Sequence, residues 1–111
     1  MVKIRKAKQA EFRKEEHFLP RNEKEKFLIK TLTSIKDEKA MAAFLRDILT
    51  IAEIEEFANR LEIARLITKG YSYQEIADKT GVSTTTVSRV SHWLFNGCGG
   101  YYQVLKKSDY P

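Results

Sequence analysis

Hydrogen-bonding side chains that could contact a nucleic acid are concentrated between residues 74 and 92. Arg89 can donate two parallel hydrogen bonds to guanine O6 and N7, or contact a phosphate. Short hydroxyl side chains near a helix start suit close approach to phosphate, because free N–H groups and the helix dipole attract anions there. No acidic residue lies between Ser83 and His92. The candidate contacts are Gln74, Ser83, Thr84, Thr85, Thr86, Ser88, Arg89 and His92.

The small and apolar residues around these positions have the spacing of a helix-turn-helix. Two helices that cross closely need a small residue at the crossing, which Ala77 provides. The turn needs a residue that tolerates a left-handed backbone, and Gly81 follows four residues later. Val82 would anchor the turn in the core. We therefore predict a helix-turn-helix over about residues 73–95, with a buried side formed by Ile76, Val87 and Val90.

Three further helices are predicted upstream, since the prolines are Pro20 and Pro111 and every glycine lies at Gly70 or later. Caps and acidic first turns place the first helix after Asn22 and the second from Asp37 to about Ile48. Thr50 and Glu53 form a capping box that opens a long third helix ending at Lys69. Its predicted buried side comprises Ile54, Phe57, Ala58, Leu61, Ala64 and Ile67, and a last short helix is predicted from Tyr101 to Lys107.

Charge is unevenly distributed along the 111 residues, whose formal net charge is +5. Residues 1–30 hold ten Lys and Arg against five Asp and Glu, whereas residues 31–111 hold ten of each. We therefore divide the chain into a basic arm, residues 1–20, and a helical domain, residues 21–111. The arm indicates a polyanionic partner or, alternatively, a solvated terminus that helps solubility. Its candidate phosphate contacts are Lys3, Arg5, Lys6 and Lys8.

Several classes of protein are disfavoured by composition. Cys98 is the single cysteine, so no intrachain disulfide can form, and two histidines with one cysteine cannot make the usual four-ligand zinc site. Nucleotide-binding glycine loops and a nucleophile-elbow motif are missing, and no acidic triad for two-metal catalysis is evident. Apolar runs are far shorter than a membrane span, and no signal peptide is visible. We expect a cytoplasmic protein that is not an enzyme and has no cofactor or metal.

Residues 50–94 resemble the Trp repressor superfamily and, in detail, the bacterial Trp-repressor-like YerC/YecD proteins. The likeness is carried by the capped helix after Thr50, by Arg60 within it, and by the stretches Gly70–Ala77 and Thr80–Val90. The Gly-rich, Tyr-containing tail Trp93–Tyr101 makes it fairly specific to that branch. The resemblance implies an all-α fold of about six helices, built as an intertwined homodimer whose helix-turn-helix units meet successive major grooves of duplex DNA.

The resemblance also implies a ligand site, which this sequence alters. In the Trp repressor, tryptophan is held between the third helix and the recognition helix. Thr50, Arg60 and Arg89 match pocket residues of the repressor. At the positions of Val90 and Trp93, however, the repressor has a glycine and a serine. We interpret Val90 and Trp93 as inward-facing groups that fill the pocket, and Arg60 as a partner of Glu56 one turn earlier. Tryptophan is therefore not expected as corepressor.

The sequence thus predicts a homodimeric transcriptional regulator, with repression as the expected sign, that binds specific duplex DNA. Ser88 and Arg89 would face base edges together with Thr84 and Thr85, while Gln74, Ser83 and Thr86 would lie near phosphates. Two alternatives stay open. One is a DNA-binding accessory module of a mobile-element enzyme, and the other is a protein-interaction domain without a DNA function. Cys98 is interpreted as an inert thiol, because no basic residue lies within three positions of it.

Overall fold

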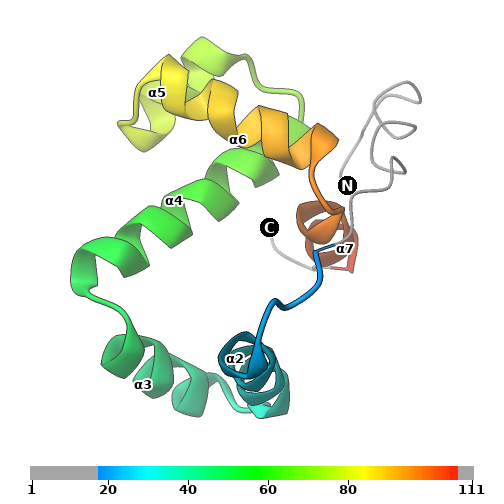
Figure 1. Ribbon diagram of the computed structural model, residues 1–111. Helices are drawn as coiled ribbons and strands as arrows, with labels where there is room; N and C mark the ends of the chain where they lie inside the picture. Colours follow the sequence, from blue (N-terminus) through cyan, green and yellow to red (C-terminus); the bar gives the residue numbers. More distant parts are fainter. Residues whose placement is uncertain (1–17, 108–111) are drawn as a thin grey trace. The chain divides into compact units, whose positions relative to one another are not determined.

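A computed structural model describes residues 18–107, which form six α-helices and no β-strand (Figure 1). The predicted all-α fold is thereby confirmed. The candidate contacts Lys3, Arg5, Lys6 and Lys8 lie outside the described residues. The helices are α2 (Glu23–Ser34), α3 (Glu38–Ile48), α4 (Ile51–Thr68), α5 (Tyr73–Thr80), α6 (Thr84–Asn96) and α7 (Gly100–Lys107). None of them is both long and apolar enough to cross a membrane.

The chain divides into two compact units, with a boundary between Phe57 and Ala58 that falls inside α4. The N-terminal unit, residues 18–57, begins its helices where the sequence predicts. Asn22 accepts a hydrogen bond from the Glu25 N–H, and Asp37 accepts one from the Ala40 N–H, both at 2.9 Å. Such caps satisfy backbone donors that have no partner within the helix. The predicted starts of α2 and α3 are therefore confirmed, and the capping box at Thr50 confirms the predicted start of α4.

That capping box is reciprocal. The Glu53 N–H donates to the Thr50 hydroxyl at 3.1 Å, and the Thr50 N–H donates to the Glu53 carboxylate at 2.8 Å. Both orphan donors at the start of α4 are therefore satisfied.

The apolar side chains of α2 and α3 are covered only in part within their own unit. Neither helix contains a fully buried residue, although Phe44 is half-buried. Phe27 is 72% exposed, and Leu28, Ile29 and Ile48 are also exposed. Contiguous exposed apolar surface on a small protein usually marks an interaction site.

The core of the C-terminal unit, residues 58–107, is assembled from four helices. α4 contributes Ile63, Ala64 and Leu66, and α5 contributes Ile76. α6 and α7 complete the core with Val87, Val90, Leu94 and Leu105. Each fully buried aliphatic side chain of this size stabilises the fold by about 1.5–3 kcal/mol. The predicted burial of Ile76, Val87 and Val90 is confirmed.

The predicted buried side of α4 is confirmed only in part. Ala64 is buried, and Leu61 and Ile67 pack against the core, whereas Phe57 is half exposed and Ala58 is exposed. Ile63 and Leu66, which were not predicted to be buried, belong to the core that α4 shares with α5, α6 and α7. The helical period alone could not distinguish two apolar stripes on one helix, because each repeats every three or four residues.

The turn between α5 and α6 has the geometry that the sequence predicts. Gly81 has a φ of 79°, in the left-handed region, and its N–H donates to the Ala77 carbonyl at 2.8 Å. Ser83 then caps α6, accepting a hydrogen bond from the Thr86 N–H at 3.2 Å. The chain therefore changes direction within the three residues between α5 and α6 (Figure 1).

Backbone conformation rather than space restricts the residue at position 81, since a Cβ built there meets no atom within 4 Å. Gly81→Ala should lower the free energy of unfolding by about 1–2 kcal/mol, the usual cost of a left-handed conformation for a residue with a Cβ. Gly81→Asn should cost less, because asparagine tolerates this region. Urea denaturation followed by circular dichroism measures both, and equal stability of Gly81→Ala and wild type would contradict the assigned turn.

Candidate nucleic-acid interface

One side of α6 is buried and the opposite side is exposed. The buried stripe consists of Val87, Val90, Ser91 and Leu94, at the spacing of one helical face. At 100° per residue, five predicted contacts project from the other side. All five are exposed, and they are Thr84, Thr85, Ser88, Arg89 and His92. The structure therefore brings together a surface of hydroxyls, one guanidinium and one imidazole, with no carboxylate on α6.

The hydroxyls of Ser83 and Thr86 are engaged at the start of α6. Ser83 caps the helix, and its Oγ lies 3.2 Å from Oγ1 of Thr86, which is half-buried. Ser83 is exposed at the turn, while Thr86 lies at the flank of α6 beside the buried stripe. The helix start thus presents exposed backbone N–H groups together with the side chains of Thr84 and Thr85, an arrangement suited to an anion.

Gln74 is exposed in the first turn of α5, and its side-chain orientation is fixed. Its Nε2 donates to Oδ1 of Asp78 at 3.0 Å. One amide N–H and the amide oxygen of Gln74 are left for another partner. Asp78 is a neighbour that the sequence analysis did not consider, although its position four residues later is the ordinary spacing for such a pair.

The start of α5 is held by a second capping box. The Ser72 N–H donates to the Glu75 carboxylate at 2.8 Å, and the Glu75 N–H donates to the Ser72 hydroxyl at 3.1 Å. Hydrogen bonds from the backbone and the side chain of Ser72 to the carboxylate lower the pKa of Glu75, and the positive charge of Lys79 adds to the effect. The stabilisation from the ionised carboxylate is therefore present above its ordinary pKa and is lost only as the pH falls through the lowered value. The box is intact at neutral pH.

Charge is divided between the two units. Residues 58–107 contain seven Lys and Arg and three Asp and Glu, a formal net charge of +4. Residues 18–57 contain seven Lys and Arg and eight Asp and Glu, a net charge of −1. The unit that carries the candidate contacts is therefore basic in its own right, which favours a polyanionic partner. This basic character is hidden when the charge is counted over residues 31–111, because the ten acidic residues of that range include those of α3 and the start of α4.

Two tyrosines at the start of α5 make contacts that sequence reasoning did not assign. The Tyr73 hydroxyl donates to Oγ of Ser91 on α6. Nζ of Lys79 lies 5.0 Å from the centre of the Tyr71 ring, within the range of a cation–π interaction. The signal for the first contact was weak, since the two residues are 18 positions apart and neither type is unusual on a helix surface.

The interpretation of Trp93 as a buried filler is wrong for this chain. Trp93 is 57% exposed, because it lies just outside the α6 stripe that ends in Leu94. Its ring meets that of His92 edge to face, with centroids 5.0 Å apart. Val90, the other predicted filler, is 5% exposed, and its inward orientation is confirmed.

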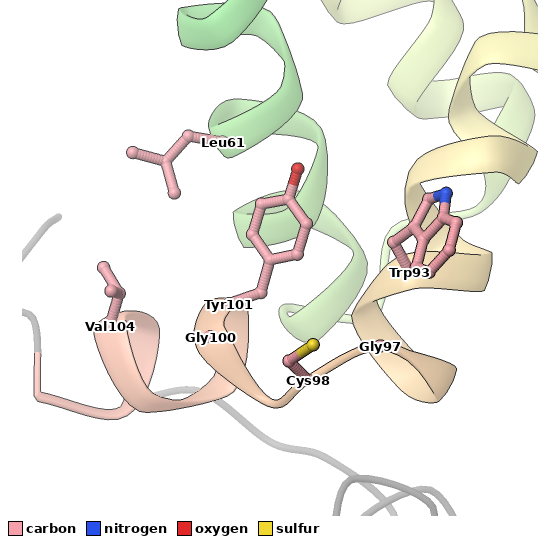
Figure 2. A pocket seen from close by; sticks show the side chains of 7 residues that line it. All are labelled: Leu61, Trp93, Gly97, Cys98, Gly100, Tyr101 and Val104. Atoms are coloured by element: carbon pink, nitrogen blue, oxygen red, sulfur yellow. The ribbon is translucent and has the colours of Figure 1, made fainter. Parts of the chain in front are cut away.

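Trp93 borders an open apolar groove of about 530 Å³ within the C-terminal unit (Figure 2). Gly97 allows α6 to end beside the indole, since a Cβ there would lie 2.5 Å from the Trp93 carbonyl oxygen. Burial raises the pKa of Tyr101, and the charge of Arg60 opposes that shift. The exposed thiol of Cys98 also faces this groove. The lining residues are Leu61, Trp93, Gly97, Cys98, Gly100, Tyr101 and Val104.

Comparison with known proteins assigns this fold to a family. The sequence profile of the family described as Trp repressor protein matches residues 23–109. YerC of Bacillus subtilis (strain 168) is 39% identical over 80 residues, which cover 72% of this chain and 77% of YerC. The chain belongs to the Trp repressor family, and the resemblance to its YerC branch is confirmed.

Solved structures agree with this assignment. A TrpR like protein from Eubacterium eligens ATCC 27750 superposes with a TM-score of 0.76 at 34% identity, over 78% of this chain and 90% of that protein. A second structure, from Staphylococcus aureus, superposes with a TM-score of 0.75 at 30% identity, over 78% of this chain and 87% of that protein. The fold described above is therefore that of Trp-repressor-like proteins.

Proposed function

We propose that the protein is a transcriptional regulator that binds specific sites in duplex DNA, without catalysis of its own, and acts in the cytoplasm. The α5–α6 pair would work as a helix-turn-helix, with α6 in the major groove. The observation that carries this proposal is the exposed side of α6, where hydrogen-bonding groups and Arg89 stand opposite the buried stripe with no acidic residue among them. Membership of a repressor family supports repression as the sign of regulation.

The roles of the contacts follow from their positions. Ser88 and Arg89, with Thr84 and Thr85, point away from the core and would read base edges. Gln74 and Ser83, near the starts of α5 and α6, would contact phosphates, and His92 would extend the contact surface by one turn. Thr86 would support the start of α6 through Ser83. The arm carrying Lys3, Arg5, Lys6 and Lys8 would add affinity that does not depend on DNA sequence.

Arg89→Ala tests the base contact on a duplex that the wild-type protein selects from a random-sequence pool. The substitution should weaken binding by about 1–3 kcal/mol if Arg89 makes a bidentate base contact. Fluorescence anisotropy measures the affinity, and circular dichroism should show an unchanged fold. Lys106→Ala, which removes the same charge from an exposed site on α7, is the matched control. Equal affinities for the two variants would contradict the role of α6, and failure of the wild type to enrich any duplex would contradict the proposed function.

We further propose that the protein is a homodimer. Several apolar side chains of α2 and α3, Phe27 among them, are exposed in their own unit, and the C-terminal unit offers an apolar groove beside Trp93. A second copy carries both surfaces and would cover both, so that each chain would bury what the other leaves exposed. Paired copies would also present two α6 helices to one duplex.

Light scattering at micromolar concentration should give about twice the chain mass of 12.9 kDa. Val104→Asp should shift the mass toward that of one chain, because Val104 lines the groove and is 57% exposed there, and the substitution would bury an unpaired carboxylate in the dimer. Gln103→Asp, on an exposed neighbouring position outside the groove lining, should remain dimeric. A wild-type chain that is folded and monomeric would contradict the homodimer.

Tryptophan is not proposed as a corepressor. The resemblance places Val90 where the repressor has a glycine, and the Val90 side chain is buried in the core. The support from Trp93 is weaker than expected, since its indole lines an open groove. Free tryptophan should leave the affinity for the selected duplex unchanged in the same anisotropy titration, and a several-fold tightening would show that the pocket is open.

A further inference from the structure

We infer that the hydrogen bond from Tyr73 to Ser91 positions the first turn of α5 against α6, and so fixes the spacing between the phosphate-contacting and base-contacting parts of the interface. The inference rests on the proposed function. Tyr73 and Ser91 thereby become positioning residues of the DNA interface, although neither stands among its predicted contacts.

The hydrogen bond joins α5 and α6 next to residues that are proposed to contact DNA. Tyr73 is the first residue of α5, and its hydroxyl donates to Oγ of Ser91, which lies in the second half of α6. Gln74 immediately follows Tyr73, and Ser88 lies about one turn before Ser91. The hydrogen bond therefore sits between the residue proposed to contact phosphate and a residue proposed to contact a base.

The other contacts described at the start of α5 are either local to it or apolar. The capping box of Ser72 and Glu75 is local to the turn, and the Gln74–Asp78 hydrogen bond stays within α5. Ile76 is buried in the shared core, but apolar burial is not directional. A helix of eight residues is also too short to be stable alone. A directional hydrogen bond to α6 restrains the rotation of α5 that these contacts permit.

The surroundings of Tyr73 and Ser91 allow each hydroxyl to keep a hydrogen-bond partner when the other is removed, so loss of the link should affect stability little. Tyr73 is 42% exposed, so its hydroxyl can bond to water when Ser91 is replaced by alanine. Ser91 is buried, and its hydroxyl can bond to a carbonyl of its own helix when Tyr73 is replaced by phenylalanine. Either substitution removes the link and leaves the ring and the backbone in place. We therefore expect binding to change more than stability.

The experiment compares Tyr73→Phe, Ser91→Ala and the double variant. Each single variant should bind the selected duplex about three- to tenfold more weakly, in line with the loss of one hydrogen bond. The double variant should bind no more weakly than the singles, since both remove the same link. Affinity for a random duplex and its salt dependence should be unchanged, because no charge is lost. Tyr71→Phe is the matched control and should bind like the wild type.

Two readouts keep folding and DNA binding apart. Thermal unfolding should show similar midpoints for all variants, while hydrogen exchange in the free protein should show a faster Ile76 amide in Tyr73→Phe. Wild-type affinity of Tyr73→Phe would overturn the inference, as would equal losses on selected and random duplexes with a lowered midpoint. If the wild type itself does not prefer the selected duplex, the proposed function fails, and unchanged exchange of the Ile76 amide would separately overturn the link between the helices.

Discussion

Burial of one stripe of α6 is the constraint on which the rest of the C-terminal unit depends. Val87, Val90 and Leu94 must leave water together, and α4, α5 and α7 each provide apolar side chains to cover them. Burial of this stripe turns the opposite side of α6 away from the core. Arg89 and the hydroxyl residues opposite the stripe are therefore presented to solvent. The surface proposed to contact DNA is the geometric consequence of the core beneath it.

Local features of the fold could be predicted because they depend on residues within a few positions of one another. The caps at Asn22, Asp37 and Thr50 satisfy backbone donors three residues away, and the left-handed turn at position 81 favours glycine. The polar side of α6 followed from its apolar periodicity. Which stripe of α4 is buried, and which hydroxyl Tyr73 reaches, depend on helices distant in sequence. A helical period alone does not contain that information.

The exposure of Trp93 likewise could not be predicted from the helical period of α6. A large aromatic side chain near an apolar stripe favours a buried position, yet the stripe of α6 passes through Leu94 and leaves the indole at the border of a groove. The N-terminal unit also has exposed apolar surface, since Phe27, Leu28 and Ile29 of α2 and Ile48 of α3 are exposed. Exposed apolar surface of this kind usually marks an interaction site. The homodimer proposed above gives both surfaces a partner.

In the proposed function, two copies of α6 enter the major groove of one duplex. Dimethyl sulfate methylation of guanine N7 measures major-groove access directly, on a duplex selected by the wild-type protein. We expect protected guanines in two clusters about one helical turn, roughly 10 base pairs, apart, related by two-fold symmetry. Protein that is bound at saturation without protecting any guanine N7 would contradict it, as would protection confined to adenine N3 in the minor groove.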